Sequence, residues 1–388
     1  MNLSPKTDYR LLYVIMCFLI PGTEAFINST TAVYLSTELN FNAQKIATYF
    51  VLYPISYVLI VQIIAKISDL GIARSKLILT ACIAGLIANF IFITRPNQYT
   101  MFFMLIPCYA VAQSAYSQIF AASREYAVLN LPSSIKFITF LRSLASLAWV
   151  IIPSFAFYLI ANGSFSLVYI FCSLTYLIIG LLAVFLMPDL KIKENNESNE
   201  KESILKNKNV MLLCLSITAI FTAFSSYYNT MPLFLIKQLR LDNQLPGTMF
   251  SISAFFEIPL MLCCPFLAKK IGLKAVISIG CIALTSFMFL LQFVTESYQI
   301  LCMAILPAIF IASVCSMGMV YFQELLFKIP GQATSLFFVS MNSGYILGGF
   351  LISIATDDHY TNVYATGSSI ALFAIILLMF VKKPQHLY

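Results

Sequence analysis

Long apolar runs separated by short polar connections dominate the sequence. Each run has about 20 residues or more, which is the length an α-helix needs to cross the hydrocarbon core of a bilayer. We therefore expect an all-α membrane protein. The runs predict twelve membrane-spanning helices, over residues 11–36, 45–67, 75–94, 99–123, 136–160, 165–187, 210–237, 245–268, 273–293, 298–323, 331–354 and 361–381.

One connection is long and polar. Residues 188–209 contain the run Lys-Ile-Lys-Glu-Asn-Asn-Glu-Ser-Asn-Glu-Lys-Glu-Ser and show no apolar periodicity. This composition is typical of a flexible linker. It divides the chain into an N-terminal six-helix half, residues 1–187, and a C-terminal six-helix half, residues 210–388.

The composition excludes a soluble protein and argues against an enzyme. Hydrophobic residues make up 60% of the 388 residues and charged residues only 10%, whereas soluble domains carry about 25% charged residues. The ten cysteines and two histidines show no metal-ligand spacing, so we expect no metal and no cofactor. A sensor should carry a large extramembrane domain, and an enzyme should show clustered His, Asp or Cys at a membrane face. Neither pattern is visible.

Positive charges gather on one side of the predicted membrane. An even number of spans places both termini on the same side, and that side holds eighteen Lys and Arg residues against four on the other. The positive-inside rule therefore predicts that both termini are cytoplasmic. The net charge of +7 follows from this topology, and we expect no nucleic-acid partner.

The two halves repeat each other at matching places. Arg124 and Glu125 end the fourth predicted helix, where Gln323 and Glu324 end the tenth. The loops that follow the second and eighth helices are both basic. Six plus six helices, in parallel halves around a central linker, resemble the architecture of major facilitator transporters.

Four stretches are similar to the bacterial sugar efflux transporter family. The resemblance spans both halves in the right order, and it implies proton-linked export of sugars or sugar-like compounds through the bacterial inner membrane. The stretches are Ala-Ser-Arg124-Glu125-Tyr126-Ala, Leu-Arg142-Ser-Leu-Ala-Ser-Leu-Ala-Trp149-Val-Ile-Ile-Pro153, Phe256-Glu257-Ile-Pro259-Leu-Met261-Leu and Gly318-Met-Val-Tyr-Phe-Gln323-Glu324-Leu.

Two departures from the family leave room for a different substrate. Ile152 stands where a glycine usually precedes the proline of the fifth helix. In the loop between the second and third helices, Ala65 takes the first glycine position and Gly71 is displaced. A multidrug or other small-metabolite exporter of the same superfamily is therefore the alternative.

Two carboxylates lie near the predicted bilayer midplane. Glu257 is about 12 residues from either end of the eighth helix, and Glu24 follows Pro21-Gly22-Thr23 in the first. Burial disfavours the charged form of a carboxyl group, so both are candidates for proton coupling. Glu24 is also a candidate for substrate binding. A permanently neutral Glu257 that bonds across helices is the alternative.

Polar and aromatic residues cluster on predicted cavity-lining helices. Amide and hydroxyl groups together with aromatic faces suit a sugar, whereas interhelical hydrogen bonding is the alternative role for each residue alone. The predicted substrate-binding residues besides Glu24 are Asn28, Gln113, Tyr116, Gln118, Arg142, Tyr227, Asn229 and Asn342.

Arg142 is a costly residue in an apolar run. It lies about 7–9 Å inside the cytoplasmic end of the fifth helix, at a rise of 1.5 Å per residue. That depth allows its side chain to reach the interface, so a structural role stays open. We predict instead that it binds substrate oxygens or pairs with a carboxylate.

Charges at the predicted cytoplasmic helix ends suggest a gate. Asp69, Arg74, Arg124, Glu125 and Glu324 lie at such ends, and ion pairs among them would hold one conformation of an alternating-access transporter. Solvated loop charges are the alternative. The expected partners are a sugar-like substrate, protons and the lipid bilayer, and we expect a monomer.

Overall fold

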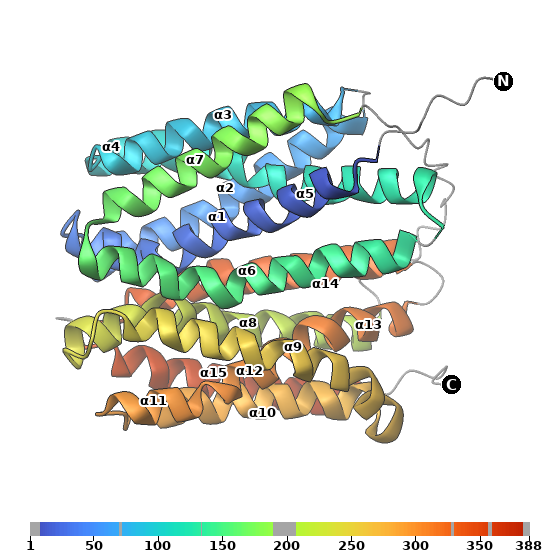
Figure 1. Cartoon of the computed structure of the whole chain (residues 1–388). Coiled ribbons are helices and arrows are strands. Elements are labelled where there is room, and N and C mark those ends of the chain that lie inside the picture. Colours follow the sequence, from blue (N-terminus) through green and yellow to red (C-terminus); the bar gives the residue numbers. More distant parts are fainter. Residues whose placement is uncertain are drawn as a thin grey trace. The chain divides into compact units, whose positions relative to one another are not determined.

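The computed structural model describes residues 8–69, 72–132, 134–188, 207–326, 330–355 and 359–382. The regular elements of these residues are helices (Figure 1), which confirms the predicted all-α fold. Most of the predicted linker lies outside them. Three short segments, η1, η3 and η4, are π-helical, a form in which each turn holds one extra residue.

The helices of the first six predicted spans follow one another with short connections. The fourth span consists of α4, η1 and α5. The bounds are α1 Arg10–Thr37, α2 Ala43–Asp69, α3 Arg74–Ile93, α4 Gln98–Thr100, η1 Met101–Leu105, α5 Ile106–Asn130, α6 Ser134–Asn162 and α7 Phe165–Phe185.

The helices of the last six spans follow the same plan. The tenth span is divided into α11, α12, η4 and α13. The bounds are α8 Lys208–Leu233, η3 Phe234–Gln238, α9 Leu245–Ile271, α10 Leu273–Leu291, α11 Ser297–Met303, α12 Ile305–Phe310, η4 Ile311–Cys315, α13 Ser316–Leu325, α14 Pro330–Ile352 and α15 Thr361–Phe380.

Eleven helices in the described part of the chain are long and apolar enough to cross a membrane. The remaining predicted span is the α4–η1–α5 segment. It carries four buried amide and hydroxyl side chains, at Gln113, Ser114, Gln118 and Ser123. The polarity of this segment is therefore concentrated inside the fold.

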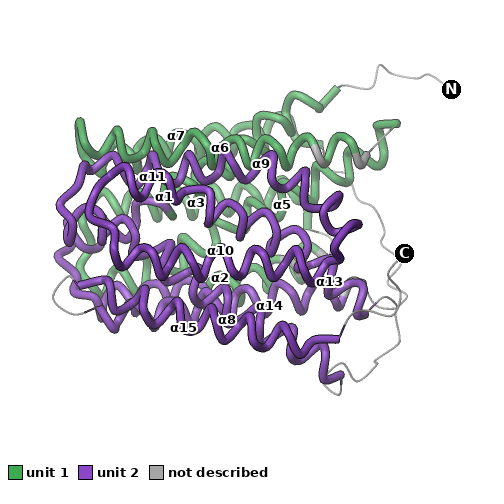
Figure 2. The backbone as a smooth tube through the Cα atoms, turned by 90° about the horizontal axis from the view of Figure 1, so that it is seen from below, with its two compact units in different colours: residues 1–28, 55–194 green, residues 29–54, 195–388 purple. Residues whose placement is uncertain are grey.

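The chain forms two compact units that do not coincide with the halves of the sequence. Unit 1 consists of residues 1–28 and 55–194, and unit 2 of residues 29–54 and 195–388 (Figure 2). The end of α1 and the start of α2 thus belong to unit 2. Within that unit Lys237 Nζ donates to the carbonyl of Ser36 over 3.4 Å.

Aromatic stacking fills the core of unit 1. The ring of Phe92 on α3 stacks on Tyr169 of α7, with centroids 4.4 Å apart and planes 5° apart. Tyr109 of α5 meets the same Phe92 ring edge-on at 6.4 Å. On α3, Gly85 lies so close to the Tyr176 ring that a Cβ would approach it to 2.7 Å. These contacts fix α3 between α5 and α7.

The core of unit 2 centres on Phe221 of α8. Its ring meets those of Phe310, Phe337 and Tyr345 at centroid distances of 5.6, 6.3 and 5.8 Å. Helices α8 and α14 approach closely because α14 has a glycine here, and a Cβ at Gly344 would lie 2.7 Å from the carbonyl oxygen of Thr218. The small-residue contact is typical of helix packing in membranes.

Candidate functional site

Three of the predicted residues form a group inside unit 1. Glu24 lies on α1, Tyr116 on α5 and Arg142 on α6, and both Glu24 and Arg142 are near enough to the Tyr116 hydroxyl to interact with it electrostatically. Glu24 also interacts electrostatically with Tyr57 of α2. The group therefore brings a carboxylate, a guanidinium and two phenols together from four helices.

The exposure of these side chains differs. Glu24 and Tyr116 are half-buried, whereas Arg142 is exposed. The Tyr116 ring stacks on Phe120 with centroids 4.7 Å apart. A fixed aromatic face next to a guanidinium and a carboxylate is suited to bind a polyhydroxylated ligand, because the ring covers C–H surface and the charged groups bond hydroxyls.

A hydrogen-bonded chain links α1 and α5 in the same unit. The Gln113 Nε2 atom donates to the Tyr109 hydroxyl over 2.7 Å, and that hydroxyl donates to Asn28 Oδ1 over 3.3 Å. The Gln113 Oε1 atom is buried without a hydrogen-bond partner among the described residues. The structure thus joins two predicted substrate-binding residues through Tyr109, which sequence reasoning missed.

A two-armed ion pair joins α3 to the end of α5. The Arg74 guanidinium binds Glu125 with both arms of a fork, Nε to Oε2 at 2.9 Å and Nη2 to Oε1 at 2.8 Å. Its Nη1 atom donates to Gln118 Oε1 at 2.9 Å and to Ser68 Oγ at 3.1 Å. Such bidentate, charge-assisted bonds are strong and geometrically specific.

This Arg74 cluster contains two of the predicted gating residues and one residue predicted for the substrate. The Gln118 side chain accepts a hydrogen bond from Arg74. Arg124, the neighbour of Glu125, is exposed at the end of α5. The Asp69 side chain lies outside the described residues.

The start of the chain is tied to the same end of α5. The Tyr126 hydroxyl donates to Asp8 Oδ1 over 3.1 Å, and Arg10 forms an ion pair with Asp8 at 2.6 Å. The side-chain hydrogen bond from Arg10 holds the pKa of Asp8 well below its usual range. Sequence reasoning missed this contact because Tyr126 and Asp8 are 118 residues apart.

In unit 2, Glu257 faces a distorted helix. It is half-buried on α9, and it is near enough to interact electrostatically with the Cys315 thiol at the end of the π-helical segment η4. π-bulges are frequent at functional sites because they redirect side chains. Nothing in the sequence signals η4.

The predicted substrate-binding residues of unit 2 are engaged in ring contacts and hydrogen bonds within the unit. The Tyr227 ring is buried and meets Phe287 edge-on at 4.7 Å. Asn229 Nδ2 donates to Ser225 Oγ over 3.3 Å on the same helix. Asn342 Nδ2 donates to the carbonyl of Phe338 over 2.8 Å, also within its helix.

The end of α13 matches the end of α5 only in part. Gln323 Nε2 donates to Thr334 Oγ1 of α14 over 2.9 Å. Glu324 is half-buried and forms no hydrogen bond or ion pair with another described residue. A neutral contact thus occupies the place where unit 1 has an ion pair.

The described residues include no group of three or more His, Cys, Asp or Glu side chains that could hold a metal ion. The cysteines among them are free thiols, five of them buried. The polar chemistry of the described fold is therefore carried by carboxylates, guanidinium groups, amides and phenols.

Comparison with a protein-family model identifies the fold. The model described as "Major Facilitator Superfamily" matches residues 13–349 and, in a second overlapping match, residues 213–387. The two matches together cover residues 13–387, which include every helix described above apart from the first three residues of α1.

Relatives that cover nearly the full chain are named sugar efflux transporters. Sugar efflux transporter C of Escherichia coli (strain K12) is 29% identical over 374 residues, which are 95% of each chain. Sugar efflux transporter A of Dickeya chrysanthemi is 29% identical over 361 residues, 91% of this chain and 92% of that protein. These matches confirm the resemblance inferred from the four sequence stretches.

Solved structures show the same fold at low identity. The nucleoside transporter NupG superposes with a TM-score of 0.79 at 15% identity, covering 97% of this chain and 99% of that one. A bacterial homologue of the iron transporter ferroportin, in an inward-facing state, reaches a TM-score of 0.75, also at 15% identity and with the same two coverages. At such identities the likeness concerns the fold alone.

Proposed function

The chain belongs to the Major Facilitator Superfamily, and we propose that it is a proton-coupled exporter of sugars or sugar-like small molecules. It is a multi-pass membrane transporter, not an enzyme, since its relatives are transporters. The substrate class is taken from the relatives named sugar efflux transporters. The mode of action is alternating access, in which the two halves rock about a central site.

The observation that carries the proposal is the group of Glu24, Tyr116 and Arg142 in unit 1. A sugar offers hydroxyls that both accept and donate, together with an apolar C–H face. Arg142 donates only, ionised Glu24 accepts only, and Tyr116 provides the ring. The group thus supports both substrate binding and a response to protonation.

Proton coupling requires a carboxyl group that can lose and gain its proton during the cycle. Glu257 and Glu24 are the candidates, because each lies half-buried on a membrane-spanning helix. In the proposed cycle, sugar leaves the cell as a proton enters, and protonation of one of these groups triggers the conformational change.

The Arg74–Glu125 pair serves as the gate latch in this proposal. A latch must be strong enough to hold one conformation and must break as a unit. The two-armed contact between α3 and α5, with Gln118 and Ser68 as further acceptors, has that character. Asp69, Arg124 and Glu324 remain proposed members of the gate.

We place the protein in the bacterial inner membrane as a monomer with both termini in the cytoplasm. The bias of eighteen positive residues against four supports this orientation. In this topology the Arg74 cluster and the start of α1 lie at the cytoplasmic side.

The test is transport in proteoliposomes that contain the purified protein and an imposed pH gradient. Labelled sugars of different size and charge are assayed one by one, with internal pH recorded by a dye. We expect movement of at least one sugar together with proton flux in the opposite direction. If no sugar moves and no proton flux follows, the proposed function is wrong.

A further inference from the structure

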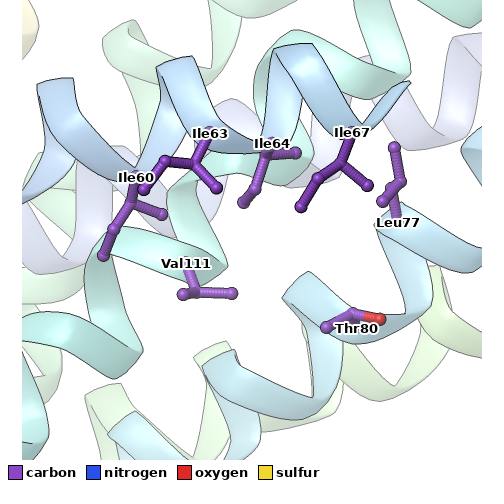
Figure 3. A pocket seen from close by; sticks show the side chains of 7 residues that line it. All are labelled: Ile60, Ile63, Ile64, Ile67, Leu77, Thr80 and Val111. Atoms are coloured by element: carbon purple, nitrogen blue, oxygen red, sulfur yellow. The ribbon is translucent and has the colours of Figure 1, made fainter. Parts of the chain in front are cut away.

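An apolar groove runs along α2 in unit 1. Four isoleucines of α2 lie along one face of the helix, opposite Val111 of α5 and beside Leu77 and Thr80 of α3 (Figure 3). The groove has a volume of about 290 Å³, roughly twice the ~150 Å³ of an apolar cavity that holds benzene. The four isoleucines are Ile60, Ile63, Ile64 and Ile67.

The groove offers nothing that could hold water. Its one hydroxyl, that of Thr80, donates within its own helix to the carbonyl of Lys76 over 2.9 Å. Water enters a buried or half-buried space only where polar groups bind it. The natural occupant of this groove is therefore hydrocarbon.

The same side of the unit carries an exposed apolar stripe. The face of α3 that carries Thr80 also carries three exposed apolar side chains. Ile83, Ile87 and Phe90 are 49%, 46% and 66% exposed. These positions share one face of the helix because they recur at intervals of three and four residues. A stripe of this kind on a membrane-spanning helix contacts lipid, so the groove opens toward the bilayer.

Two lysines flank the end of the groove. Lys66 lies next to Ile67 on the last turn of α2, and Lys76 lies one turn before Thr80 on the first turn of α3. Both side chains are exposed. The residue preceding α3, Ala73, provides no side-chain cap for the first N–H groups of that helix, and helix N-termini attract anions.

The nearby charges leave this end positive. Lys66, Arg74 and Lys76 outnumber Asp69 and Glu125 here, and Glu125 is bound by both arms of Arg74. A basic site at the mouth of an apolar groove complements a phospholipid that has an anionic headgroup and an acyl chain.

We propose that this groove binds an anionic phospholipid of the surrounding membrane, with one acyl chain along the isoleucines of α2 and the phosphate at Lys66 and Lys76. The site is separate from the substrate group at Glu24 and does not depend on the proposed transport function. It joins α2 to α3 from outside, beside the Arg74 cluster.

The test uses fluorescence from one tryptophan in the groove. Trp149 is the only tryptophan of the chain, so Trp149→Phe followed by Ile63→Trp gives a single reporter. The protein is reconstituted in phosphatidylcholine vesicles that contain a minor fraction of lipid with brominated acyl chains. The brominated lipid is either phosphatidylglycerol or phosphatidylcholine with the same chains.

We expect brominated phosphatidylglycerol to quench the reporter more strongly, with a relative affinity on the order of threefold to tenfold above phosphatidylcholine. The double substitution Lys66→Gln/Lys76→Gln should abolish this preference. The matched control Lys269→Gln/Lys270→Gln removes two charges at the end of α9 and should leave it unchanged. Val111→Phe should reduce quenching by both lipids, because the ring fills the groove.

A second reporter distinguishes binding at this groove from a general enrichment of anionic lipid around the protein. An apolar cavity of the same volume lies between α3 and α7, and Leu181 lines it. In the Trp149→Phe background, Leu181→Trp should show a smaller preference than position 63, because α7 carries no lysine. Equal quenching by both lipids at position 63, or a preference that survives Lys66→Gln/Lys76→Gln, overturns the proposal. The proposal is also overturned if neither lipid quenches the tryptophan at position 63 because a second copy of the chain covers the groove.

Discussion

Two corresponding helix ends differ in how they are held. At the end of α5, Glu125 is bound by both arms of the Arg74 guanidinium, with side chains only 13% and 24% exposed. At the end of α13, Glu324 has no such partner among the described residues, and Gln323 makes one neutral hydrogen bond to Thr334. The repeated sequence motif therefore has a charged version in unit 1 and a neutral version in unit 2.

The comparison shows that the two copies of a repeated sequence motif can be held by interactions of different strength. A half-buried bidentate ion pair resists opening until it breaks completely, and its loss leaves a charge without a partner. A single neutral hydrogen bond is exchanged for water at small net cost. The proposed latch would thus reside mainly in unit 1.

Removing the Arg74 guanidinium should have the largest effect on stability. Arg74→Gln leaves the half-buried Glu125 carboxylate unpaired, which should cost about 1–3 kcal/mol, between the values for exposed and fully buried pairs. Thermal unfolding of the purified protein in detergent measures the loss. Arg74→Lys keeps the charge without the fork and should recover only part of it. An unchanged melting temperature for Arg74→Gln would contradict the assigned strength of the pair.

Removing the neutral contact of unit 2 should have a smaller effect. Thr334→Val keeps the shape of the side chain but removes the acceptor for Gln323, at a cost of about 0.5–1.5 kcal/mol. Thr285→Val is a suitable control, because its hydroxyl donates within its own helix to the carbonyl of Cys281. If Thr334→Val destabilises the protein as much as Arg74→Gln does, the contrast between the two ends is wrong.

The exposed pair at the start of the chain should have the smallest effect. The pKa of Asp8 is lowered by Arg10, so the pair stabilises the folded state at neutral pH, and this contribution disappears as the pH falls below the ordinary aspartate range. Asp8→Asn should lower the melting temperature slightly at pH 7 and not at all in strong acid. Thermal melting curves of Asp8→Asn and of the unchanged protein, recorded from pH 7 down to strong acid, test this prediction. If the difference in melting temperature between the two proteins grew on acidification, the assigned role of the pair would be contradicted.

The sequence predicted the fold, and it singled out Arg74 and Glu125 as charged residues at helix ends. Run length alone predicted the spans, because hydrocarbon thickness sets helix length. Arg74 and Glu125 could be chosen as gate residues because charges at helix ends are few. That they pair with each other, and that Gln118 joins them, depends on the rotation of α3 against α5, which no short-range pattern specifies.

Other features required the folded chain. Tyr109 links Asn28 to Gln113, yet only its spacing of four residues from Gln113 hints at the contact. The grouping of residues 29–54 with unit 2 follows from close approaches such as Gly349 to Phe50, where a Cβ would meet the Phe50 backbone at 2.7 Å. Backbone proximity between distant helices has no signature in hydrophobic periodicity.

The most direct test of the proposed mechanism is transport by the Glu257→Gln variant in proteoliposomes. Glutamine keeps the size and hydrogen-bonding ability of the side chain but cannot exchange a proton. The account predicts that sugar transport driven by a pH gradient is lost, while exchange of labelled for unlabelled sugar without a gradient continues. Glu24→Gln, assayed in parallel, shows which carboxylate couples. If both variants keep full gradient-driven transport, neither carboxylate couples protons to sugar and the account is contradicted.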